Sequence, residues 1–188
     1  MLEQDFVSFL PTYAKPFAKQ LQELPLNYEK WVYAAALPSK IYQGDLFSGV
    51  RFASIDDDGE AIVADVPAMV LSNTCDVQPE QSESLLVAPL IDLEDYSAQS
   101  VLAGEELENH IRALKRNEIS QLMFLPEAHG VKNCFVDFSR ISPLPLSYFY
   151  SNTAANRFQS LSSCGHYVMM VKVAHHFTRP ESPDAARA

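Results

Sequence analysis

The sequence has few of the residues that build disulfide frameworks or structural zinc sites. Its 188 residues include three cysteines, Cys75, Cys134 and Cys164, which lie far apart in the chain. An odd number of widely spaced cysteines argues against a disulfide framework, and without a Cys-x-x-Cys pair a structural zinc site is not expected. The sequence therefore predicts a reduced, cytoplasmic protein that carries no cofactor.

Long hydrophobic runs are also missing. No stretch of about 18 apolar residues is present, so a membrane-spanning helix is not expected. Residues 1–20 contain two acids and two prolines, and they lack the basic start and the unbroken apolar core of a signal peptide. These features predict a protein with no membrane partner.

Positive charge is scarce, because 14 Lys and Arg residues stand against 24 Asp and Glu residues, which gives a net charge of -10. Such a chain repels phosphate backbones at long range, so a broad nonspecific nucleic-acid surface is not expected. Net charge does not exclude a local basic groove. It is equally compatible with an acidic surface that binds a basic protein or mimics nucleic acid.

The order of the predicted elements indicates an α+β fold. Proline-interrupted helices are expected over residues 16–24 and 27–37, within an N-terminal helical extension of residues 1–40. Residues 41–180 are predicted to form a small, mostly antiparallel SH3-like β-barrel with inserted and C-terminal helices. Residues 181–188 are expected to be a flexible tail.

Within the barrel region, hydrophobic patterns and turn residues define individual elements. Strands are predicted over residues 46–53, 61–71, 84–91, 121–126 and 133–144. A middle helix over residues 103–120 is predicted to bury Leu107, Ile111 and Leu114. A closing helix over residues 162–177 is predicted to bury the stripe Tyr167, Met170, Val171, Ala174 and Phe177.

The first three predicted strands resemble the MazF/PemK family of toxins, which are small SH3-like barrels. The resemblance rests on "QGDLF" (residues 43–47), "VPAMVLSNT" (residues 66–74) and "LLVAPLI" (residues 85–91). It covers about a quarter of the chain. It implies a sequence-specific endoribonuclease that is often a homodimer and binds RNA and an antitoxin-like protein.

One position changes what this resemblance implies. The family usually has an arginine directly before the proline of the second strand, where it acts on the scissile phosphate. Val66 stands at that position here, before Pro67. We therefore expect a toxin- or defence-related module that binds RNA or a protein partner and has altered or lost endoribonuclease activity.

The candidate catalytic residues form the segment "SNTCD", which contains Ser72, Asn73, Thr74, Cys75 and Asp76. The Cys75 thiol would act as a nucleophile if a histidine, a cation or a helix N-terminus lowered its pKa. The alternative is a hydrogen-bonded turn after a strand, in which Cys75 is a small buried hydrophobic residue. The residue types favour the turn, but the density of functional groups keeps this segment first among the candidate sites.

A metal site and an anion site are further alternatives. Cys75 and Asp76 would accept a soft metal together with His129 or His166, although no metal-ligand spacing is present. Arg51 and Arg140 are the candidate phosphate contacts, and His166 lies where a helix start would bind an anion. Three hypotheses remain open: the RNA- or partner-binding module, a Cys/Asp-dependent enzyme or metalloprotein, and an acidic protein-interaction module.

Overall fold

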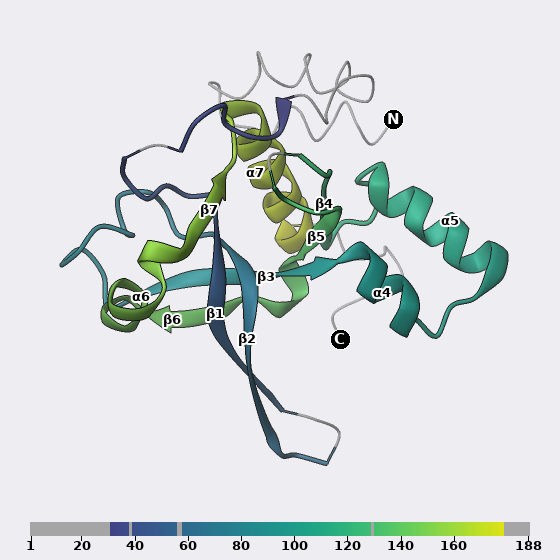
Figure 1. Cartoon of the computed structure of the whole chain (residues 1–188), viewed down its shortest axis with the longest axis horizontal. Helices are drawn as coiled ribbons and strands as arrows, with labels where there is room; N and C mark the ends of the chain where they lie inside the picture. Colours follow the sequence, from purple (N-terminus) through teal and green to yellow (C-terminus); the bar gives the residue numbers. More distant parts are fainter. Residues whose placement is uncertain (1–30, 38, 56–57, 129, 179–188) are drawn as a thin grey trace, which may run out of the picture.

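The fold is α+β, with an open, mostly antiparallel seven-stranded sheet and four α-helices among the described residues (Figure 1). The structure is a computed structural model that describes residues 31–37, 39–55, 58–128 and 130–178. The strand order is β4-β5-β3-β2-β1-β7, and β6 pairs with β3 outside this path. The predicted α+β class and the mostly antiparallel sheet are thus confirmed. The sheet does not close through pairing of β4 with β7 within the described residues.

The elements follow one another from the middle of the chain to its C-terminal part. The strands are β1 (Asp45–Ile55), β2 (Ala61–Val70), β3 (Ser84–Asp92), β4 (Leu122–Leu125), β5 (Cys134–Asp137), β6 (Ser142–Pro145) and β7 (Arg157–Ser160). The helices are α4 (Leu93–Gln99), α5 (Gly104–Lys115), α6 (Leu146–Asn152) and α7 (Ser163–Thr178). The first three predicted strands and the middle and closing helices are confirmed, with shifted ends.

Three short elements were not predicted from the sequence: α4, α6 and β7. Helix α4 begins where the Asp92 carboxylate accepts hydrogen bonds from the backbone N–H groups of Glu94 and Asp95. Helix α6 has the sequence LSYFYSN, whose aromatic residues are typical of strands. The single strand predicted over residues 133–144 is wrong, because β5 and β6 are separated by the 3-10 turn Phe138–Arg140.

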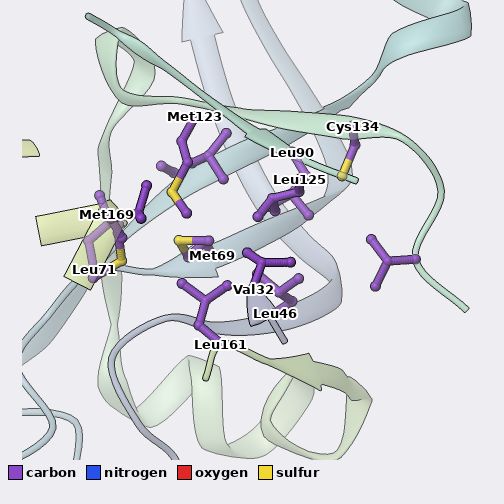
Figure 2. Close-up of a cluster of buried hydrophobic side chains, with 14 of the residues drawn as sticks. Val32, Leu46, Met69, Leu71, Leu90, Met123, Leu125, Cys134, Leu161 and Met169 are labelled. Atoms are coloured by element: carbon purple, nitrogen blue, oxygen red, sulfur yellow. The ribbon is translucent and has the colours of Figure 1, made fainter. Parts of the chain in front are cut away.

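The largest hydrophobic cluster lies between the sheet and α7 (Figure 2). Met69, Met123 and Met169 come from β2, β4 and α7 and are all fully buried in it. Unbranched thioether side chains adapt to irregular space, which suits a junction between one helix and separate strands. A second cluster joins β1–β3 to α6 through Phe47 and Phe149, whose ring centroids are 5.0 Å apart.

A third cluster lies under α4 and α5. Leu114 of α5 is fully buried beside Leu122, Phe124 and Phe135, and Ile111 packs against the same cluster. The stripe predicted for the middle helix is therefore confirmed at these two positions. No helix in the described ranges has both the length and the apolar character needed to cross a membrane.

The segment before β1 belongs to the main core. Val32 and Tyr33 are buried in the largest cluster, and Tyr33 forms an antiparallel β-bridge with Leu161. The Tyr33 hydroxyl also donates a hydrogen bond of 2.9 Å to the Pro126 carbonyl. The helix predicted over residues 27–37 is thus wrong after Trp31, because pairing with a distant segment overrides local helix propensity. Residues 16–24 and 181–188 lie outside the described residues.

Helix α7 buries a different face from the predicted one. Val168, Met169 and Lys172 are buried, whereas Met170 and Phe177 are 40% and 64% exposed. Apolar residues surround this helix on several sides, so hydrophobic periodicity alone could not select the face that contacts the sheet.

We expect Gly165→Ala to destabilise the protein although alanine is the better helix former. A Cβ at position 165 would lie 2.2 Å from the carbonyl oxygen of Val32, so α7 and the segment before β1 would have to separate. Overpacking of this kind costs about 1–3 kcal/mol, which outweighs the gain of about 1 kcal/mol from helix propensity. Urea denaturation checks this result. Ser163→Ala, at the exposed start of α7, is the control, and a more stable Gly165→Ala protein would contradict the prediction.

Candidate functional site

The "SNTCD" segment forms a hydrogen-bonded turn directly after β2. The Ser72 hydroxyl accepts a hydrogen bond of 2.7 Å from the backbone N–H of Leu86 in β3. The Asn73 side chain accepts one of 3.1 Å from the N–H of Cys75, and the Asn73 carbonyl accepts from Asp76 and Val77 at 2.9 and 3.2 Å. Asn73 therefore shapes the backbone, as the turn interpretation predicts, and Ser72, which that interpretation did not include, also bonds to the backbone.

Thr74 connects this turn to the segment before β1 and to α7. The Thr74 hydroxyl accepts a hydrogen bond of 3.2 Å from the backbone N–H of Gln43. The Gln43 side chain donates to the Leu71 carbonyl at 2.6 Å, and its amide oxygen lies 3.0 Å from Nε2 of His166. Because that oxygen only accepts, Nε2 of His166 carries the hydrogen in this contact. Burial also lowers the pKa of His166, which favours its neutral form.

Cys75 and Asp76 project from the turn into solvent. Both residues are exposed, so the expectation that Cys75 is a buried hydrophobic residue is wrong. The turn needs only backbone groups and the Asn73 side chain at this point, so the Cys75 side chain is left outside the core. Neither side chain has a hydrogen bond or an ion pair within the described ranges. A base that activates a thiol lies within hydrogen-bond reach of it, and no described residue forms a hydrogen bond with the Cys75 side chain.

The other predicted site residues lie on separate elements. Arg51 of β1 donates two hydrogen bonds, of 2.8 and 3.0 Å, to the carboxylate of Asp65 in β2. This contact raises the pKa of Arg51 through its hydrogen bond and charge. Arg140 is exposed at the end of a 3-10 turn, while His166 belongs to α7. Among the described residues, no hydrogen bond or ion pair joins any two of these three side chains.

The metal alternative rests on residues that the structure describes only in part, because His129 lies outside them. Among the described residues, no group of three or more His, Cys, Asp or Glu side chains is arranged to hold a metal ion. An open hollow of about 710 Å³ lies elsewhere, between the loop after the turn and α6. Its lining residues are Pro79, Glu80, Ser82, Glu83, Leu146, Ser147, Tyr150 and Ser151. Cys75 and Asp76 are not among them.

A buried polar cluster at the start of β1 was not predicted from the sequence. Asp45 has no exposed surface, and its carboxylate accepts a hydrogen bond of 2.7 Å from the guanidinium of Arg157. It also accepts hydrogen bonds from the Ser160 hydroxyl and, at 2.9 Å, from the backbone N–H of Tyr42. Asp45 is the aspartate of the "QGDLF" motif, and that motif was the only signal in the sequence. The cluster joins β1 to β7 and is structural.

The most exposed part of the sheet is the outer half of the β1–β2 hairpin. We call residues 51–55 of β1 and 61–66 of β2 the arm. In Figure 1 the arm extends away from the rest of the sheet. Strand β7 pairs with β1 only at residues 45–47, and β3 pairs with β2 only at residues 68–70. Within the described residues, both outer edges of the arm are therefore unpaired.

Apolar side chains lie on the arm without cover. Ile55 is 69% exposed, Ile62 is 49% exposed and Val63 is 55% exposed. The Arg51–Asp65 ion pair lies at the base of the arm. Ile55 and Val63 lie on one face of the ribbon, whereas Ile62, which pairs with Ser54, lies on the other. Scattered exposed apolar residues are ordinary, but exposed aliphatic side chains on both faces of a short two-stranded ribbon are typical of binding surfaces.

Comparison with known proteins gives no family or relative from which a function could be transferred, so the proposed function rests on the geometry described above. No protein-family model matches the chain, and no curated protein sequence matches it.

We expect Cys75 and Cys134 to differ sharply in reactivity with a disulfide reagent. Cys75 is exposed and should react in the native protein. Cys134 is buried, and desolvation raises its pKa to about 12, so it should react only on unfolding. Cys75→Ser should remove the fast phase without changing stability. If Cys75 reacted far faster than the same residue in an unfolded peptide, its thiol would be activated and the enzyme hypothesis would regain support.

Proposed function

We propose that the chain is a protein-binding module and that the arm is its binding element. The observation that carries this proposal is an aliphatic β-ribbon with both faces exposed and both outer edges unpaired. A two-stranded ribbon alone is at best marginally stable, and unpaired edges invite another strand. Addition of a partner strand would bury the aliphatic side chains and satisfy the open backbone groups.

This proposal agrees with the partner-binding side of the MazF/PemK resemblance. In that reading, the chain is a toxin- or defence-related module whose RNA cleavage is altered or lost. Val66, which stands at the position of the catalytic arginine of the family, lies half-buried at the base of the arm. The nearest candidate cation, Arg51, is held by Asp65.

Protein is favoured over RNA as the partner because of charge and the position of the cations. The chain carries a net charge of -10, and Arg51, Arg140 and His166 come from three separate elements. Arg157 contacts the buried Asp45 carboxylate, and Lys172 is itself buried. An RNA-binding groove needs several cations along one path. An enzymatic role of Cys75 and Asp76 has less support, because both side chains lie in solvent without an activating partner among the described residues.

We expect Val63→Lys to remove partner binding while the protein stays folded. Val63 is 55% exposed on the arm, so a lysine is tolerated there but interferes with strand addition at the edge. The measurement is recovery of cross-linked partner with the tagged full chain from cells of its source. Recovery should fall at least about tenfold, which corresponds to about 1.4 kcal/mol of binding free energy.

The matched control is Val101→Lys, because Val101 is 99% exposed and lies outside the arm, between α4 and α5. This variant introduces the same charge and should leave recovery unchanged. Equal loss with both variants, or an arm variant that retains its partner, would contradict the proposal. So would RNA that co-purifies and is lost with Arg51→Ala.

A further inference from the structure

We infer that the partner contributes a basic, aliphatic segment that adds as an antiparallel strand to the outer edge of β2 in the arm. This inference rests on the proposed function, since it names the chemistry of the partner at the same surface. It follows from where the β2–β3 pairing ends, from the side chains on each face of the arm, and from the charge around the arm.

The β2–β3 pairing ends at a proline. The last pair toward the arm is Ala68 with Pro89, and Pro89 has no N–H to donate to a ladder. Beyond it, β3 leaves β2 and pairs with β5 at Leu90. The outer edge of β2 over residues 61–66 is consequently open, although the inner edge is fully paired with β1.

Residues 61–64 of this edge lack the devices that usually protect one, whereas Asp65 and Pro67 lie nearer the body of the sheet. Exposed edges of natural sheets commonly carry a charge, a proline or a bulge. Residues 61–64 have the sequence AIVA, are all exposed and pair regularly with β1. The irregularity in β1 lies nearer the body, between Phe47 and Val50. A regular, uncharged and exposed edge of this kind is suited to pairing.

The faces of the arm determine the side chains that an added strand needs. Directly paired residues share a face, so one face carries Ile55 with Ala61 and Ala53 with Val63. From the tip of the arm to the Arg51–Asp65 pair at its base, every residue on this face is apolar. An added strand would extend it with aliphatic side chains at alternate positions, because successive side chains point to opposite faces.

Charge determines what flanks these aliphatic residues in the partner. Residues 51–66 contain one base, Arg51, and five acids, which gives a net charge of -4. The acids are Asp56, Asp57, Asp58, Glu60 and Asp65. Four of them lie between the two strands of the arm, so a partner strand with Lys or Arg at that end is attracted.

The same charges disfavour a second copy of this chain as the occupant. A second copy that paired through its own arm would add a net charge of -4 at the contact and a net charge of -10 to the complex. Like charges brought together at an interface are unfavourable. The inference therefore assigns the edge to a different, basic protein.

The test uses the full chain and two synthetic peptides as probes. One is Val-Thr-Val-Thr-Val-Lys-Lys, whose lysines would lie beside the start of β2, next to Glu60, in antiparallel pairing, and the other ends in Glu-Glu instead. Fluorescence anisotropy at low salt should show at least about tenfold tighter binding of the basic peptide, and 1 M salt should reduce this difference. Backbone amide NMR signals of residues 61–66 should shift on binding.

Two variants on the apolar face and one outside it complete the test. Val63→Lys and Ile55→Lys should each weaken binding of the basic peptide about tenfold or more, and Val101→Lys should leave it unchanged. Circular dichroism confirms that each variant is folded. Equal binding of both peptides, no binding, or amide shifts only outside the arm would overturn the inference.

Sedimentation separates this inference from the proposed function. A dimer of the full chain that Val63→Lys dissociates would assign the edge to a second copy and overturn the basic partner. The arm would still be a protein-binding surface in that case. Recovery of cellular partner that does not depend on Val63 would instead overturn the proposed function itself.

Discussion

Asp45→Ala is expected to lower the free energy of unfolding by about 3–5 kcal/mol, the range for removing one partner of a buried ion pair. The Asp45 side chain has no exposed surface, and that of Arg157 is 14% exposed. Without the carboxylate, the guanidinium keeps the cost of burial but loses its charged partner. The Ser160 hydroxyl and the Tyr42 N–H also lose their acceptor. Urea denaturation at pH 7, followed by circular dichroism, measures the loss.

The chain contains a matched control for this experiment. Arg51 and Asp65 form an ion pair of 2.8 Å, close to the 2.7 Å of the buried pair, but their side chains are 54% and 49% exposed. Water already solvates such a pair, so Asp65→Ala should change stability no more than the error of the measurement. Equal effects of Asp45→Ala and Asp65→Ala would show that burial of the Asp45–Arg157 pair does not govern its contribution.

Lys172 is expected to make stability rise with pH in the alkaline range. Its ammonium group is buried and donates hydrogen bonds of 2.8 and 2.6 Å to the carbonyls of Asn117 and Ile119. Desolvation lowers the pKa of Lys172 from 10.5 to about 8. Between these two values the unfolded chain binds the proton and the folded chain releases it. Stability therefore rises with pH in this window, by about 3 kcal/mol at about 1.4 kcal/mol per pKa unit.

A difference between two proteins isolates this contribution. Burial raises the pKa of Cys134 from its ordinary value of 9.0 to about 12, so that thiol destabilises the folded state as pH rises above 9.0. The same loss occurs in Lys172→Met, which keeps the volume of the side chain but removes the titrating group. The stability of the wild-type protein relative to Lys172→Met should increase by about 3 kcal/mol from pH 7 to pH 10.5. If the unfolding free energies of the two proteins changed with pH in parallel, Lys172 would not lose its proton in the folded state at a lower pH than in the unfolded state.

The local parts of the fold were predictable because their signals are local. Strands β1 and β2 flank the turn at Gly59, and β3 is an apolar run, so all three were predicted within two residues of their ends. The turn at Asn73 was also predictable, since small polar side chains bond to nearby backbone groups. In contrast, α6 was not predicted, because its aromatic residues favour strands by local propensity. The helix instead depends on packing of Phe149 against Phe47, which is distant in sequence.

The candidate site was predictable in position but not in exposure. The residues between Ser72 and Asp76 do form the turn after β2, yet nothing in their sequence says that Cys75 points into solvent. Asp45 is one of many acids in the sequence until Arg157, 112 residues later, is placed against it. Contacts between residues this far apart depend on strand order, which single-sequence patterns do not encode.

The sequence by itself determined the composition class, the alternation of the first three strands and the polar turn after the second, because propensity and periodicity act over a few residues. Tertiary structure alone decided which of these elements were covered. Residues 61–64 read as an ordinary apolar strand, but β3 leaves β2 at Pro89 and β7 leaves β1 after Phe47. Burial is set by neighbours distant in sequence, so a segment patterned for a core became an exposed arm.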